Sequence, residues 1–195
     1  PAHANIGPRT PVPAHRAAKV VAVFMLAGSP AAADIDPSSG IDFVRIGAVG
    51  NAAWAGNGNP VDEAVGRGRV NYEYSIGRME VTTAQRAEFY NAAFDRPSSD
   101  QIPHLSPPTR WGAQEISPTV PGGRRWRVPA GNELRFVGDI TWREAAQFCN
   151  WLNNAKPTAL TAIANGAYDT STFGQNDDGT YTDQSAHNPG AKFWI

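Results

Sequence analysis

The sequence predicts a loop-rich α+β domain, and three observations lead to this prediction. Glycine and proline are abundant, with 19 and 16 of the 195 residues, which favours turns and disfavours a helical bundle. Residues 70–76 alternate apolar and polar side chains with the period of a half-buried strand. The segments that follow Thr82 and Thr141 instead have the capping pattern and spacing of amphipathic helices.

Composition and charge exclude several classes of protein. The chain has 17 basic and 18 acidic residues and a net charge of −1, which argues against a nucleic-acid binder. Hydrophobic residues make up 41%, enough to build a core. A single cysteine excludes an internal disulfide scaffold and a multi-cysteine zinc site. No apolar run has the length that a membrane span requires.

Residues 1–33 have the order of a secretory signal peptide. Arg16 and Lys19 form a basic patch, residues 20–26 are apolar, and small residues lead to cleavage near Ala33. The alternative is a short buried helix, which an internal glycine and proline disfavour. We therefore expect an exported protein, whether periplasmic, cell-surface or secreted.

The mature chain is expected to begin with a linker at 34–40 and to continue as one domain over 41–195. A strand is predicted at 41–46, a surface loop at 47–68 and a strand at 70–76 that Met79 and Val81 extend.

The first helix is predicted to begin at Thr82, which forms a capping box with Gln85. Ala87, Tyr90 and Phe94 give this helix one apolar face. Irregular structure is expected over 97–135, around two tryptophans.

The second helix shows the clearest pattern in the chain. Thr141 and Glu144 form another capping box, and Asn153 and Asn154 mark the end of the helix. Its apolar stripe comprises Ala145, Phe148, Cys149 and Leu152. Beyond it, 165–168 and 178–181 each carry a turn dipeptide before a tyrosine, and both are predicted to form hairpin turns.

Few residues suggest metal chemistry. His104 and His187 remain after signal removal, in contexts that favour surface or turn positions over a shared metal site. Residues 176–179 resemble part of a calcium loop, but Gly174 stands where the first aspartate is required, so a hairpin turn is favoured.

Cys149 has two interpretations. It is a candidate nucleophile or soft-metal ligand, for copper(I) for example. Its place on the apolar stripe favours a core residue or half of a disulfide, that is, a structural thiol.

The segment "YEYSIGRMEVTTAQRAEFYNAAF" (72–94) resembles "IGKYEVTNAQYAEFLNAV" of the formylglycine-generating enzyme family, also called sulfatase-modifying factor domains. The segment "DITWREAAQFCNWLN" (139–153) resembles that family's "VSWYDALAYCNWL". The phrase "NGAYDTSTFG" (165–174) is similar to an insertion common in exported bacterial members. The resemblance covers about 41–195, the N-terminal half or more of the family domain.

This resemblance implies a turn-rich α+β fold distantly similar to C-type lectins. The founding activity oxidises a cysteine of a protein or peptide substrate to formylglycine with copper and oxygen. The family's copper-binding cysteine pair, near "GGSW", and its "LPTEAEWEYAA" segment would follow Ile195, so the domain is expected to be truncated at its C-terminus. No catalytic residue, cofactor or metal is therefore expected within this chain. The resemblance also makes Cys149 a candidate structural disulfide partner.

Three functional hypotheses remain. One is the N-terminal part of an oxidase, inactive as an isolated chain. The second is a non-catalytic lectin-like module that binds a peptide, a glycan or another cell-envelope ligand, with Trp54, Trp111 and Trp126 as a stacking surface; the alternative is that these tryptophans are buried. The third, a non-haem iron branch, needs a preceding helical domain and is disfavoured. If C-terminal strands normally cover the second helix, Phe148 and Leu152 are expected to be partly exposed.

Overall fold

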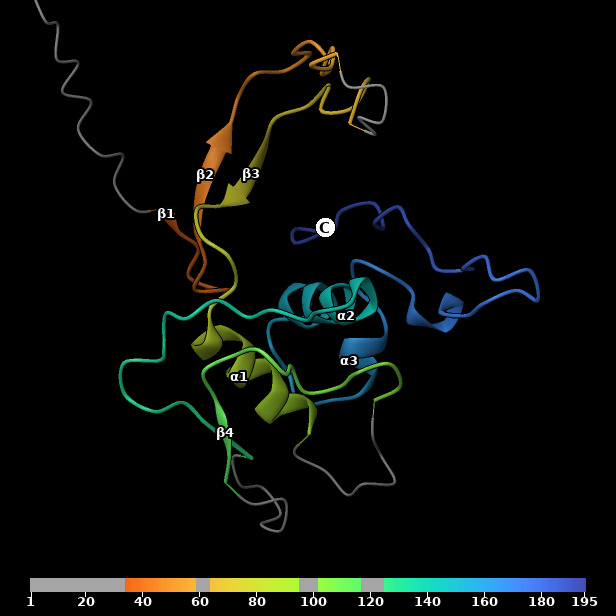
Figure 1. Ribbon diagram of the computed structural model, residues 1–195. Coiled ribbons are helices and arrows are strands. Elements are labelled where there is room, and N and C mark those ends of the chain that lie inside the picture. Colours follow the sequence, from red (N-terminus) through yellow and green to blue (C-terminus); the bar gives the residue numbers. More distant parts are fainter. Residues whose placement is uncertain (1–33, 59–63, 95–101, 117–124) are drawn as a thin grey trace, which may run out of the picture. The chain divides into compact units, whose positions relative to one another are not determined.

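The computed structural model describes residues 34–58, 64–94, 102–116 and 125–195, so the predicted signal peptide lies outside the described residues. The described part combines two small antiparallel sheets with short helices, which confirms the α+β class (Figure 1). The elements in chain order are β1 (Asp34–Ile35), β2 (Asp42–Ile46), β3 (Tyr74–Gly77), α1 (Thr83–Ala93), β4 (Gln114–Glu115), β5 (Trp126–Arg127), α2 (Trp142–Asn153), α3 (Thr161–Ala164) and the 3-10 helix η2 (Thr170–Thr172).

The larger sheet has the strand order β1-β2-β3, with both pairs antiparallel. Strand β2 confirms the predicted strand at 41–46. The predicted linker at 34–40 contains strand β1 and a turn, in which the Asp36 carboxylate accepts the backbone N–H groups of Ser38 and Ser39. This turn reverses the chain and lets β1 pair with β2.

Strand β3 is shorter than the alternating pattern predicted. It begins at Tyr74, where its pairing with Ile46 of β2 starts, and ends at Gly77. The predicted extension of the strand does not form, and Met79 is 70% exposed. Alternation alone did not find the strand ends because they are set by the pairing partner, whose own strand stops at Ile46.

Helix α1 begins at the predicted position. The Thr82 hydroxyl accepts the Gln85 backbone N–H at 3.4 Å, and the Gln85 side-chain oxygen accepts the Thr82 N–H at 3.0 Å. Ala87 and Tyr90 on its apolar face are buried, and Phe94 at its end packs against the same core.

Helix α2 has the second predicted capping box, between Thr141 and Glu144. It is buried on more faces than a single apolar stripe implies, because Gln147, Asn150 and Trp151 are also buried. Aromatic rings join it to α1, with Phe89 of α1 packed against Phe148 and Trp151 at centroid distances of 5.5 and 5.3 Å.

The expected exposure of Phe148 and Leu152 was wrong, since each is only 5% exposed. The C-terminal segment supplies cover, because Phe193 belongs to the same buried cluster. The Asn153 side chain holds this segment: its oxygen accepts the Lys192 N–H at 2.7 Å, and its amide donates to the Phe193 carbonyl at 2.6 Å.

One of the two predicted hairpin turns is present. Between Gln175 and Tyr181 the chain reverses, and the Asn176 N–H donates to the Thr180 carbonyl at 2.8 Å. Residues 165–168 form no hairpin and instead pass into the core, where Ala167 and Tyr168 are fully buried.

The described parts of 97–135 are mostly irregular, as predicted, apart from the β4–β5 pair. Asn91 of α1 anchors this region by accepting the Trp126 N–H at 2.7 Å and donating to the Trp126 carbonyl at 3.0 Å. No helix in the described part of the chain has the length and apolar character of a membrane span.

Candidate binding surface and the buried thiol

Cys149 lies in a small core with Ala146, Ala167 and Tyr168, and its thiol is free. Burial raises the pKa of the Cys149 thiol to about 12, although the Arg86 guanidinium acts in the opposite direction. The thiol is therefore protonated at neutral pH, whereas nucleophilic attack and metal ligation both require the thiolate. The structure places Cys149 as a core residue.

The two histidines lie against different neighbours. The Nδ1 atom of His104 is 3.3 Å from Nη1 of Arg143, and the His187 ring stacks on Trp194 at 5.0 Å. Within the described ranges, no three histidine, cysteine, aspartate or glutamate side chains gather as a metal site would require.

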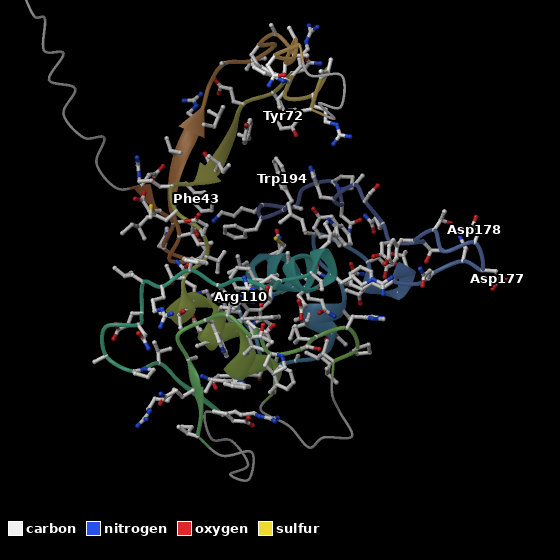
Figure 2. The ribbon with its side chains drawn as sticks, viewed as in Figure 1. Phe43, Tyr72, Arg110, Asp177, Asp178 and Trp194 are labelled. Atoms are coloured by element: carbon white, nitrogen blue, oxygen red, sulfur yellow. The ribbon has the colours of Figure 1, made fainter. Side chains whose placement is uncertain are left out.

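The segment that resembled part of a calcium loop, 176–179, forms the hairpin turn between Gln175 and Tyr181. Asp177 and Asp178 lie at the exposed tip of this turn (Figure 2). One Asp178 carboxylate oxygen accepts both the N–H and the hydroxyl of Thr180, at 2.9 and 2.6 Å. Gly179 adopts φ +85°, a left-handed conformation that glycine tolerates without strain. The carboxylate therefore stabilises the turn itself.

The three tryptophans proposed as a stacking surface do not form one. Trp126 is 7% exposed and packs with Trp111 at a centroid distance of 5.1 Å in the core against α1. Trp54 is 49% exposed in the loop that follows β2. Because Trp126 is buried and Trp111 is partly buried against it, the three tryptophans do not form the predicted platform.

A different set of rings meets at the surface, and we call it the aromatic cluster: Tyr72, Tyr74, His187 and Trp194. The ring centroid of Trp194 lies 6.2 Å from Tyr72, 6.3 Å from Tyr74 and 5.0 Å from His187. Tyr72 and Tyr74 are 6.2 Å apart and meet edge to face. Figure 2 shows Tyr72 and Trp194 coming from two distant parts of the sequence.

Both segments of the cluster are held by the fold. Tyr74 is the first residue of β3, and Tyr72 lies two residues earlier. Trp194 lies between two anchored residues, because Phe193 is bound by Asn153 and the Ile195 N–H donates to the Tyr168 hydroxyl at 2.9 Å.

The cluster combines apolar ring area with polar groups at an accessible surface. Tyr72 is 53% exposed, and the other three rings are half-buried. Tyrosine, tryptophan and histidine all present an apolar body and a hydrogen-bonding edge, a combination found repeatedly at binding surfaces.

Sequence reasoning assigned Tyr72 and Tyr74 to a strand and did not single out Trp194 or His187 as site residues. The i, i+2 spacing of the tyrosines was the available signal, because side chains two apart on an extended chain share a face. More than a hundred residues separate them from His187, so only tertiary structure joins the two segments.

No family model, curated protein or solved structure matches the chain.

Proposed function

We propose that this chain is an exported, non-catalytic binding module with a fold of the formylglycine-generating-enzyme type, and that its aromatic cluster binds a carbohydrate of the cell envelope. The observation that carries this proposal is the cluster of four rings around Trp194, with Tyr72 53% exposed. The family relationship rests on the sequence resemblance at the two helix segments.

The chemistry of the cluster suits a sugar ring. One face of a pyranose is lined by C–H groups, which stack on the electron-rich face of an aromatic ring, while its hydroxyls need hydrogen-bonding partners at the rim. Tyr72 and Tyr74 supply phenolic hydroxyls next to ring surface, and Trp194 supplies the largest ring. The ring contacts within the cluster hold these groups in place before a ligand arrives, which lowers the entropy cost of binding.

The state of Cys149 supports the non-catalytic role. The oxidase chemistry that the resemblance implies uses a pair of copper-binding thiolates, whereas the one thiol here is buried and protonated. Copper, and a substrate that contains cysteine, therefore belong to this proposal only for a longer polypeptide that carries the cysteine pair.

Isothermal titration of the chain with soluble oligosaccharides and purified cell-wall fragments tests the proposal. Tyr72→Ala and Trp194→Ala are expected to weaken binding at least tenfold, the typical loss for a buried aromatic anchor. Trp54→Ala is the matched control, because Trp54 is 49% exposed but outside the cluster. Absence of binding to every glycan, or equal losses in the control, would overturn the proposal.

A further inference from the structure

A cavity of about 580 Å³ opens between the 102–104 segment, α2, α3 and η2. We call it the α2–α3 cavity; none of its lining residues belongs to the aromatic cluster. Its volume is within the range of roughly 300–1,000 Å³ that is typical of small-molecule sites.

The walls of the cavity differ in chemistry. Ile102, Leu160 and Ala164 supply apolar lining, and Leu160 is 38% exposed. Asp169 and Gln147 are among the polar groups that line it. A ligand that suits this mixed lining has a short apolar stem and one polar or charged end.

Asp169 is the one acidic side chain among the lining residues that the structure describes. Its Oδ1 accepts the Ser171 N–H at 2.9 Å, and the hydrogen bonds from Ser171 lower the pKa of the Asp169 carboxyl. The carboxylate is therefore ionised at neutral pH and attracts a cation.

Arg143, which lies beside the lining residue His104, is already paired with an acidic side chain. Its guanidinium donates to both oxygens of Asp183, at 2.7 and 2.8 Å, and to the Gly174 carbonyl at 2.8 Å. It also faces Nδ1 of His104, a lining residue, at 3.3 Å. Among the residues that the structure describes, the Asp169 carboxylate takes part in no ion pair and accepts hydrogen bonds from Ser171.

Gln147, another lining residue, has a side-chain oxygen without a hydrogen-bond donor among the described residues. Its side chain is buried, and its amide nitrogen donates to the Pro103 carbonyl at 2.7 Å, which fixes the orientation of the amide. Its Oε1 finds no hydrogen-bond partner in the part of the chain that the structure describes. A buried acceptor without a partner is costly, and a ligand N–H group would relieve that cost.

From these groups we infer that the α2–α3 cavity binds a primary alkylammonium group, such as a lysine side chain or a free aliphatic amine. The ammonium pairs with the Asp169 carboxylate, and the methylene stem packs on Leu160 and Ala164. A primary ammonium only donates hydrogen bonds, which matches the two acceptors named here, the Asp169 carboxylate and the Gln147 amide oxygen.

Nuclear magnetic resonance titration with Nα-acetyl-lysine methylamide tests the inference, with the norleucine analogue as the uncharged match. The lysine compound is expected to shift the amide resonances of 102–104 and 169–171 and to bind at least tenfold more tightly than norleucine. Butylammonium in a parallel titration separates the sources: equal binding indicates a free amine, and weaker binding indicates a lysine within a peptide.

Asp169→Asn keeps the oxygen that Ser171 binds and removes the charge, so it is expected to weaken binding at least tenfold. Asp177→Asn, the same change on the exposed hairpin turn, is expected to leave binding unchanged. If Asp169→Asn alters the fold, as its spectrum would reveal, Ala164→Leu fills the exposed edge of the cavity instead and is expected to abolish binding. Equal affinity for the lysine and norleucine compounds, shifts elsewhere in the chain, or no binding would overturn the inference.

Discussion

The Asn150 side chain holds the backbone of Tyr168 on both sides. Its oxygen accepts the Tyr168 N–H at 2.8 Å, and its amide donates to the Tyr168 carbonyl at 2.8 Å. The same amide donates to the Ile163 carbonyl at 2.9 Å. Asn150 is fully buried, so this one side chain from α2 satisfies two backbone groups of Tyr168 and one of α3, and holds both segments on α2.

Asn150→Ala is expected to destabilise the fold by about 2–4 kcal/mol, because it leaves three buried backbone groups without partners. Chemical denaturation followed by circular dichroism measures the free energy of unfolding. Asn176→Ala, which removes one exposed hydrogen bond to Thr180, is the control and is expected to cost well under half as much. Similar losses of unfolding free energy in the two variants would show that the hydrogen bonds of Asn150 stabilise the fold no more than the exposed bond of Asn176.

The Cys149 thiol is expected to be unreactive in the folded protein. A thiol reagent at pH 8 should label it only as fast as the chain unfolds, because the pKa of Cys149 is raised to about 12. Comparison of labelling with and without denaturant makes the test. Rapid labelling of the native chain contradicts the burial of Cys149.

The same pKa shift predicts a loss of stability in alkali. Below the unfolded-state pKa, near 9, the thiol is protonated in both states; above it only the unfolded thiol ionises, so stability falls from about pH 9 to about pH 12. The loss attributable to Cys149 is up to about 4 kcal/mol. Cys149→Ala lacks this titration, so denaturation curves of the two proteins should diverge over that range. Parallel curves would contradict the shift.

The Arg143–Asp183 ion pair is expected to make the free energy of unfolding depend on pH in the acidic range. Hydrogen bonds from Arg143 hold the pKa of Asp183 below its usual range, so the pair stabilises the fold above about pH 4 and is lost as pH falls through the folded-state pKa. Asp183→Asn should lower the melting temperature at pH 7 and flatten the acid side of the stability curve. Asp177→Asn should do neither.

The 195-residue chain is expected not to oxidise cysteine. With copper and oxygen, a cysteine peptide should form no aldehyde that a hydrazide probe can trap, because Cys149 is the one thiol and is buried. Copper-dependent aldehyde formation by this chain alone would remove the proposal of a non-catalytic module.

Local signals in the sequence predicted the helix starts best. Thr82 with Gln85 and Thr141 with Glu144 form reciprocal hydrogen bonds within four residues, so no tertiary information is needed to recognise them. The strand at 41–46 was equally accessible.

Residues 165–168 show where local reasoning failed. The Asn-Gly dipeptide suggested a hairpin, but Gly166 serves a close approach: a Cβ there would lie 3.0 Å from the Asn150 Cα. An Asn-Gly dipeptide can form a hairpin turn or allow a close approach between two backbones. Only the position of α2 distinguishes these two roles.

The sequence did not reveal which tryptophans are buried, or that the aromatic cluster forms, for a related reason. Aromatic residues in loops are either buried or exposed according to long-range packing. Trp126 is buried and Trp111 is partly buried because Asn91 and Tyr90 of α1 contact them. Trp194 became a surface residue beside Tyr72 through the anchoring of its neighbours to α2. Neither the burial of Trp126 nor the surface position of Trp194 can be predicted from a short stretch of sequence.

The most direct test of the proposed function is the indole N–H resonance of Trp194, assigned by its loss in Trp194→Phe, during titration with cell-wall oligosaccharides. We expect this resonance to shift in a saturable manner while that of Trp54 stays in place, and we expect Tyr72→Ala to weaken the response at least tenfold. A Trp194 resonance that does not move while other parts of the chain respond, or that moves equally in Tyr72→Ala, would contradict binding at the aromatic cluster.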